Sequence, residues 1–483
     1  MPLFNVKVKW GKELFSDVEL NTDEEPIVFK AQLYALTGVK VERQKVMFKG
    51  KVVGNDLWVK DGLKDGITIL MMGTADELPI APKEKIVFME DMSESELGLA
   101  KQYPAGLTNL GNSCYLNATV QCLRTVPELK QLLKKFDEER GQAGLPLTLT
   151  SSLRDVFLSM DKSATVTPII LFQALHMAFP RFAEKGEQGG YMQQDANECW
   201  TELVRVLQQK LKPIQGDNSV SQVKQYTSFI EQYFGIAFDS VMKCTEDENE
   251  PETKSVENLL QLSCYISQEV KYLQSGLKAR LSEQITKFSP SLNRDAVYVK
   301  TSKISRLPAY LTIQFVRFFY KERESVNAKI LKDIKFTLSL DMFELCTEEL
   351  QNKLIPMRNK FKEHEEKLLH TIQEKGDDNK QQDKQQNKIH PYSFPDDCGS
   401  NNSGYYELQA VLTHKGRSSS SGHYVAWIRR KGDEWFQCDD DVVSLVTSEE
   451  ILKLSGGGDW HCAYVLLYGP RVLEIEDSDM QVN

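Results

Sequence analysis

The sequence predicts a two-domain α+β protein, and three features of its 483 residues favour this fold class. The first 75 residues or so read as short strands around one amphipathic helix. A longer second part begins with a largely helical stretch from about Cys114 to Phe182 and ends in strand-like segments. Helices and strands segregated in this way are typical of α+β folds, and the length exceeds the roughly 100 to 200 residues of one usual domain.

Composition and charge exclude several classes of protein. Hydrophobic residues make up 41% and charged residues 27% of the chain, and no apolar run approaches the roughly 20 residues that span a bilayer, so no transmembrane segment is expected. The net charge of −10 argues against a nucleic-acid partner. The chain starts without a signal-peptide pattern and carries nine cysteines, an odd number. We therefore expect free thiols and a cytoplasmic location, with the nucleus as a second possibility.

Residues 1–75 are the first predicted domain. Apolar and polar side chains alternate in its strands, and the helix has a proline at its start and a glycine at its end, which is the usual asymmetry. The expected elements are strands at 4–8 and 18–20, a helix from Pro26 to Gly38, and strands at 45–48 and 67–71. Two strands, a helix and further short strands form the order of a β-grasp domain.

A linker is expected at 76–99, because prolines and an acidic run replace the apolar pattern there. The second domain is expected over 100–475. Within it, residues from about 374 to 404 are rich in Asp, Gln, Lys, Asn and Ser, so we predict a disordered insertion. The predicted strands of this domain are 310–315, 406–412, 424–430, 435–438 and 463–468.

Cys114 is the candidate nucleophile. A glycine-bearing loop precedes it and apolar residues follow at helical spacing, so it is predicted to start a helix, where the dipole favours the thiolate. The backbone N–H of Cys114 and the amide of Asn109 are candidate donors for an oxyanion. The alternative is a buried structural cysteine beside a turn-forming asparagine, and Cys122 on the same helix is expected to be such a cysteine.

Three histidines, His414, His423 and His461, are candidate bases. His423 follows a serine-rich loop at 418–422 and opens a predicted strand, so it is placed where a side chain can face a cleft.

The expected partner of His423 is Asp439. Counting back from the turn near 431–433 puts His423 opposite residue 439 or 440 of the returning strand. A carboxylate on one imidazole nitrogen fixes the tautomer and leaves the other nitrogen to take the thiol proton. The alternative is that Asp439, Asp440 and Asp441 form a solvated acidic turn.

Three motifs of this second domain resemble those of the ubiquitin-specific proteases, a family of papain-like cysteine proteases. Gly-Leu-Thr-Asn109 through Gly-Asn-Ser-Cys114-Tyr-Leu-Asn resembles the cysteine box, with Ser113 where threonine is usual. Tyr-Met-Gln-Gln-Asp195-Ala-Asn-Glu resembles a second box, and Ser-Gly-His423-Tyr-Val with Asp439 resembles the histidine box. The resemblance implies a domain of fingers, palm and thumb that hydrolyses the isopeptide or peptide bond at the C-terminus of ubiquitin. It also implies that Gln193, Gln194 and Asp195 bind the ubiquitin tail.

The first domain resembles ubiquitin in residues 29–31 and 46–51 and in its closing strand. It runs on past Gly73 without a diglycine end, so we expect a docking domain rather than a conjugated modifier. Family members with such a domain associate with the regulatory particle of the 26S proteasome and trim ubiquitin from bound substrates. By this resemblance Met47 and Leu70 would be docking residues, whereas the alternative is that they pack locally.

No cofactor and no metal are expected. Many members of the family hold zinc through paired CxxC motifs, but this chain has no such pair, and Cys244 and Cys264 stand alone. Two other functions stay open at this point: a non-catalytic adaptor for the proteasome or ubiquitin, and a hydrolase of another ubiquitin-like modifier.

Overall fold

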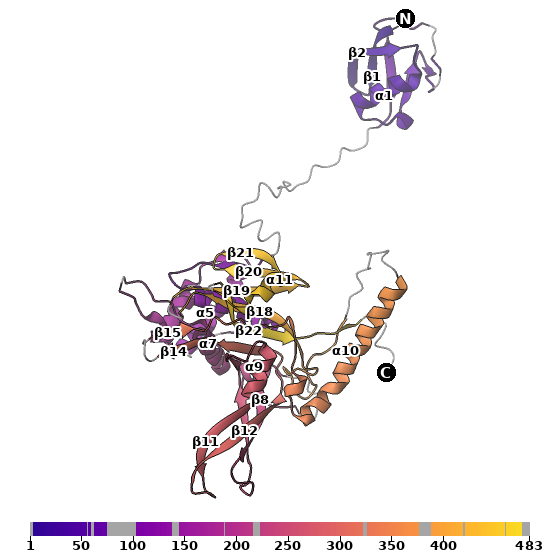
Figure 1. Cartoon of the computed structure of the whole chain (residues 1–483). Helices are drawn as coiled ribbons and strands as arrows, with labels where there is room; N and C mark the ends of the chain where they lie inside the picture. The colour runs from indigo at the N-terminus through magenta and orange to yellow at the C-terminus, as the bar shows by residue number, and fades with distance from the viewer. Residues whose placement is uncertain are drawn as a thin grey trace. The chain divides into compact units, whose positions relative to one another are not determined.

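The chain forms two compact units, Met1–Phe88 and Met89–Asn483 (Figure 1). The computed structural model describes residues 3–55, 57–58, 62–74, 103–137, 144–187, 189–215, 223–321, 326–375, 388–418, 421–458 and 460–475. The predicted linker at 76–99 lies outside these residues. Among the helices of the described ranges, none combines the length and the apolar composition needed to cross a membrane.

The first unit is a five-stranded sheet with one helix, as the predicted β-grasp order requires. Its strands lie in the order β2-β1-β5-β3-β4, with β1 and β5 parallel at the centre. The helix ends at Gly38, whose φ of 69° is left-handed and whose N–H donates to the carbonyl of Tyr34. The elements are β1 Leu3–Trp10, β2 Glu13–Asn21, α1 Pro26–Thr37, β3 Lys45–Phe48, β4 Lys51–Val52 and β5 Thr68–Met72.

Helices occupy most of the first half of the second unit. The central one, α3, is buried on every side, because all residues from Cys114 to Leu123 are buried. A helix without an exposed face must be enclosed by other elements, and α3 packs against β19, β18 and α7. The helices are α3 Cys114–Arg124, α4 Pro127–Lys134, α5 Leu145–Met160, α6 Ile169–Ala178, α7 Ala196–Lys210, α8 Phe229–Phe234, α9 Leu273–Arg280, α10 Glu348–Lys375 and α11 Ser448–Leu452.

The main sheet of this unit has eight strands in the order β10-β13-β22-β18-β19-β20-β21, with β16 beside β18. Its strands β18, β19 and β22 are largely buried and pack against α3 on one side. The strands are β10 Leu262–Tyr265, β13 Leu311–Val316, β16 Ser339–Asp341, β18 Tyr405–Lys415, β19 His423–Lys431, β20 Glu434–Asp439, β21 Val442–Thr447 and β22 Cys462–Pro470.

A separate four-stranded sheet, in the order β11-β12-β8-β9, extends away from the helices in Figure 1. Together the helices, the main sheet and this extension match the predicted thumb, palm and fingers. The remaining strands form two-stranded pairs. The extension has β8 Ile236–Cys244, β9 Thr253–Leu259, β11 Ser282–Ser289 and β12 Arg294–Arg306; the pairs are β6 Gly106–Leu107 with β7 Thr165–Val166, β14 Phe318–Lys321 with β15 Val326–Lys329, and β17 Lys388–Ile389 with β23 Glu474–Ile475.

The predicted disordered insertion at about 374–404 is wrong for its second half. Residues 388–404 are folded, whereas 376–387 lie outside the described residues. The polar side chains that suggested disorder make local hydrogen bonds instead: Asn401 Oδ1 accepts from the N–H groups of Ser403 and Gly404, and Asn402 Nδ2 donates to the Pro391 carbonyl. Composition alone predicts that such residues face solvent. Here their side chains form hydrogen bonds with buried backbone groups instead.

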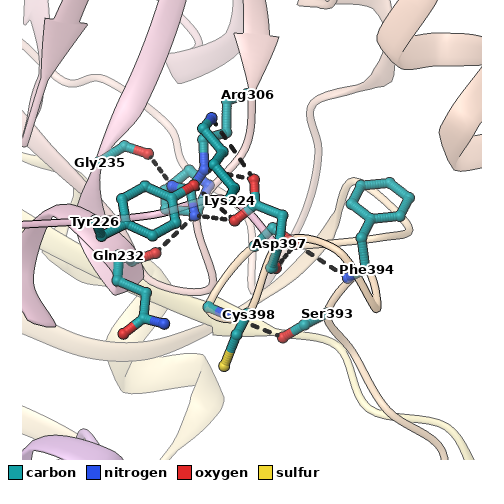
Figure 2. A network of polar contacts seen from close by, with 12 residues as sticks. Lys224, Tyr226, Gln232, Gly235, Arg306, Ser393, Phe394, Asp397 and Cys398 are labelled. Atoms are coloured by element: carbon teal, nitrogen blue, oxygen red, sulfur yellow. Dashed lines mark hydrogen bonds and ion pairs between the residues drawn. The ribbon is translucent and has the colours of Figure 1, made fainter. Parts of the chain in front are cut away.

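An ion pair between Arg306 and Asp397 attaches this segment to the rest of the unit (Figure 2). Arg306 is only 6% exposed and donates from Nε and a terminal nitrogen to the two carboxylate oxygens, at 2.9 and 2.7 Å. Its guanidinium also donates to the carbonyls of Gln232 and Gly235, and the Tyr226 hydroxyl donates to Asp397. The pair therefore joins residues 388–404 to β12 and to the end of α8.

Replacing Asp397 with alanine is expected to destabilise the second unit by about 3–5 kcal/mol, because it leaves the Arg306 guanidinium buried without its counter-charge. Equilibrium denaturation of the full chain, followed by tryptophan fluorescence, measures the change. The matched control is Glu349→Ala, which removes an exposed pair with Lys353 and should cost about 0.5 kcal/mol or less. Equal losses for the two variants would contradict a stabilising role for the buried pair.

Candidate active site

Cys114 is the first residue of α3, as the sequence predicts. The loop before it turns tightly through Gly111 and Asn112, whose φ angles of 91° and 57° are left-handed. Asn109 Oδ1 accepts from the Gly111 N–H at 2.9 Å, and Ser113 Oγ accepts from the N–H of Leu110 at 2.8 Å. The loop thus directs the chain into the helix with the thiol at its positive end. Cys114 itself is 1% exposed.

His423 and Asp439 are brought together at the open end of the hairpin β19–β20. His423 Nε2 lies 2.5 Å from Asp439 Oδ1. The contact is predicted correctly, but the register behind it differs, since the ladder pairs Ala426 with Cys438 and, if continued, would set His423 opposite Asp441. The long imidazole reaches its partner diagonally along the sheet.

His423 also hydrogen-bonds the Cys114 side chain. This contact is the largest cause of a raised pKa of His423. Partial burial opposes the rise and the bond to Asp439 adds to it, so that the pKa is about 9. Because Nε2 faces Asp439, the nitrogen that faces the sulfur is Nδ1. Both contacts therefore favour the protonated form of the His423 imidazole.

The other two candidate bases are held neutral by burial. Burial lowers the pKa of His414 to about 3 and that of His461 to about 4. His414 Nε2 donates to the Ser421 carbonyl at 3.0 Å, and His461 Nδ1 lies 3.2 Å from Thr413 Oγ1. Both rings are packed structural groups, so only His423 joins the cysteine.

Asp440 is a site residue that the sequence analysis did not single out. Its Oδ2 accepts from Asn109 Nδ2 and its Oδ1 from Asn117 Nδ2, each at 2.8 Å, and its carbonyl accepts from the N–H of Leu107. Asp440 has a left-handed φ of 52°. No local pattern could reveal this role, because both asparagines lie more than three hundred residues away in the chain.

The predicted role of Asn109 as an oxyanion donor stays a prediction. Its Nδ2 donates to Asp440 and its Oδ1 accepts from the N–H of Gly111, so the side chain is firmly oriented. An amide nitrogen carries two hydrogens, and this bond uses one of them.

The second motif lies beside the nucleophile. Asn112 donates to the Tyr191 carbonyl, and Gln193 Oε1 lies 3.7 Å from the Cys114 sulfur. Asp195 caps α7 by accepting from the N–H groups of its first turn, and it also accepts from the Tyr464 hydroxyl at 2.8 Å. Gln194 is half-buried in the same segment. Their predicted contacts with a ubiquitin tail are not tested by these positions.

One group of possible metal ligands lies in the described part of the chain: His423, Asp439 and Asp440, whose ligand atoms are within 4.8 Å of one another. These atoms already take part in hydrogen bonds. His423 bonds Asp439, and Asp440 bonds Asn109 and Asn117. The prediction that the protein needs no metal therefore stays a prediction. All nine cysteines are free thiols.

In the first unit, the two predicted docking residues face each other across neighbouring strands. Met47 on β3 pairs with Leu70 on β5, and both point away from the core that Val46 and Ile69 help to form. Leu70 is 40% exposed and Met47 half-buried. The docking role of these two residues stays a prediction.

The chain is similar to known proteins over nearly its whole length. A family model described as "Ubiquitin carboxyl-terminal hydrolase" matches residues 105–468. Ubiquitin carboxyl-terminal hydrolase 7 of Arabidopsis thaliana is 42% identical over 98% of this chain and 100% of its own length. Ubiquitin carboxyl-terminal hydrolase 14 of Caenorhabditis elegans is 43% identical over 98% and 94%. Ubiquitin carboxyl-terminal hydrolase 6 of Schizosaccharomyces pombe is 40% identical over 96% and 98%.

Among solved structures, the fold is similar to the SAGA Ubp8/Sgf11/Sus1/Sgf73 DUB module bound to ubiquitin aldehyde. The TM-score is 0.52 at 19% identity, over 80% of this chain and 73% of the other. At this identity the likeness concerns the fold.

The protonation of His423 is expected to follow its two contacts. In the full chain, histidine NMR should give a titration midpoint near pH 9. Cys114→Ala should lower it most, because the thiol contact is the largest cause, and Asp439→Asn should also lower it by removing a charge. Because the folded-state pKa is above the ordinary 6.5, the stability that this proton contributes is complete below about pH 6.5 and is lost as pH rises through 9.

The His423→Gln variant assigns the resonance. A wild-type midpoint near 6.5, unchanged in both variants, would show that neither contact holds in solution.

Proposed function

Because the chain belongs to the ubiquitin carboxyl-terminal hydrolase family of thiol proteases, we propose that it trims ubiquitin from substrates bound to the proteasome, with Cys114 as nucleophile and His423 as base. Family membership establishes the coarser activity, deubiquitination by a cysteine protease. The observation that carries the choice of residues is the contact chain from Cys114 through His423 to Asp439.

The proton moves first within the pair. Asp439 holds Nε2, so the ring presents Nδ1 to the sulfur and accepts the thiol proton there. The imidazolium then faces a thiolate at the start of α3, and the helix dipole and the imidazolium both favour that charge. Cys114 is thereby activated by His423 and ready to attack.

Acyl transfer follows from this arrangement. The Cys114 sulfur bonds to the carbonyl carbon of the last ubiquitin residue, and the carbonyl electrons move to oxygen, where the N–H of Cys114 and the Asn109 amide are the proposed donors. Collapse of this intermediate breaks the C–N bond, and His423 returns its proton to the leaving amine. Water, deprotonated by His423, then hydrolyses the thioester and frees ubiquitin. Gln193, Gln194 and Asp195 are proposed to bind the tail that carries this carbonyl.

Access to the sulfur is limited in the free chain. A residue that is 1% exposed cannot meet a peptide carbonyl until neighbouring groups move. The loop that ends at His423 is attached to β18, because its Ser421 carbonyl accepts a hydrogen bond from His414 Nε2. We propose that these groups move when the protein docks, so that the enzyme becomes fully active only in the docked state.

Docking is assigned to the outer face of the first unit. The apolar side chains of Leu70, Met72 and Val52 are 40%, 49% and 52% exposed on this face. Lys7 and Lys9 lie on the neighbouring strand β1, whose pairing with β5 sets them on the same face. An apolar patch beside lysines suits a partner with an apolar centre and an acidic rim. We propose that this face binds the regulatory particle of the 26S proteasome. The nine free thiols support a cytoplasmic location, with a nuclear one as the further proposal.

A ubiquitin suicide probe tests the enzyme. With proteasomes present, the wild type should form a covalent adduct, and Cys114→Ala should form none because the attacking sulfur is gone. Asp439→Asn should slow adduct formation by about 10²-fold or more, since the ring loses its orienting charge. Failure of the wild type to react would favour a non-catalytic adaptor. Faster reaction with a probe built on another modifier would favour that modifier as substrate.

The docking face is tested in the full chain by Leu70→Asp. A buried charge at the centre of an apolar contact should abolish co-sedimentation with proteasomes, and deletion of residues 1–75 should do the same. Leu36→Asp is the matched control, because Leu36 is 46% exposed on α1 rather than on the sheet face. Retained co-sedimentation after the deletion would refute docking through this unit.

A further inference from the structure

Gln193 is the side chain of the second motif that touches the nucleophile. It is 6% exposed, and its Oε1 lies 3.7 Å from the Cys114 sulfur, within reach of an S–H donor. The other end of the same amide, Nε2, is buried and has no hydrogen-bond partner among the described residues. A buried donor of this kind costs stability wherever it lacks a partner, so its placement calls for a function.

The polarity of this contact changes with the charge on sulfur. An amide oxygen suits a neutral thiol, which donates its hydrogen. When the proton passes to His423, the sulfur becomes an anion, and an oxygen beside it is repelled, whereas an N–H is attracted. Half a turn of the amide about its last side-chain bond exchanges the two ends, which have nearly the same shape. That turn breaks no hydrogen bond at Nε2, because Nε2 has none to lose among the described residues.

We propose that Gln193 is a further catalytic residue that donates its Nε2–H to the Cys114 thiolate. No covalent bond changes at Gln193: the thiol proton goes to Nδ1 of His423, and the amide turns to stabilise the charge left on sulfur. The bond disappears when sulfur enters the thioester. Gln193 therefore raises the fraction of enzyme that is ready to attack, a role separate from holding a ubiquitin tail.

Among the described residues, Gln193 is the neutral side chain whose amide lies within hydrogen-bond distance of the Cys114 sulfur. The titratable groups that interact with Cys114 are His423 and Tyr424 on β19 and Tyr115 on α3, with Asp439 behind His423. Both tyrosine hydroxyls are buried, and burial raises the pKa of each well above 10, so they stay neutral. His423 is the one cation in this set, and Gln193 adds a neutral donor beside it.

The inference rests on the proposal that Cys114 is the nucleophile, and the test separates the two. The ionisation midpoint of Cys114 is measured in the full chain from ultraviolet thiolate absorbance against pH, with the same variant carrying Cys114→Ala subtracted. The pH dependence of alkylation by iodoacetamide, which has no ubiquitin tail, is the second readout. Gln193→Met keeps the size of the side chain and removes the donor, so the midpoint should rise by about one to two pH units.

Gln193→Glu should raise the midpoint further, because it sets a carboxylate beside the thiolate. Gln194→Met, in the same segment, is the control for the midpoint and should leave it where the wild type has it. Unfolding temperatures show whether each variant is folded, and either Gln193 variant alone suffices for the comparison.

A wild-type midpoint shared by Gln193→Met and Gln193→Glu overturns the inference while leaving the nucleophile in place. A wild type with no ionisation that Cys114→Ala removes would instead overturn the proposed nucleophile. A change confined to ubiquitin affinity, with the midpoint fixed, would leave Gln193 as a tail-binding residue only.

Discussion

The active site depends on the hydrogen bonds of Asp440, which connect the segment around Cys114 to the end of the hairpin that carries His423. Its carboxylate accepts from Asn109 and Asn117, which flank Cys114 in sequence, and Asn109 is 331 residues away from it. Asp440 also follows Asp439 directly, so the group that holds the cysteine loop is covalently next to the group that orients His423. A helix start and a hairpin end are thereby placed within one hydrogen bond of each other. The packing of α3 against β19 brings the same two elements together, and the bonds of Asp440 fix the loop before Cys114 to the hairpin end.

The histidines of the main sheet show how position decides chemistry. His414 and His461 lie among buried side chains, and burial lowers the pKa of both below the physiological range. The side chain of His423 is a third exposed and has Asp439 and the Cys114 side chain as partners, so its pKa rises instead. The same side chain is thus a neutral packing group at two places and a proton carrier at the third. The difference lies in the partners, because desolvation opposes charge and a neighbouring anion favours it.

Much of the fold was predictable because it follows local rules. Alternation of apolar residues predicted the strands of the first unit, and the proline and glycine at its ends predicted α1. The folded segment 388–404 was missed, because its polar residues find partners only once Arg306 and the end of α8 lie beside them. The contact of His423 with Asp439 was predicted from hairpin arithmetic, although a register shift between Arg429 and Lys431 changes the pairing behind it.

The sequence by itself determined the elements, the helix start at Cys114 and the chemical types of the acting groups, since spacing along a chain is enough to specify a local conformation. Only the tertiary structure decided that Asp440 joins the cysteine loop to the end of the hairpin and that the Gln193 amide lies against the sulfur. These contacts join residues far apart in the chain. Their existence depends on how sheets and helices pack, and no local pattern records that packing.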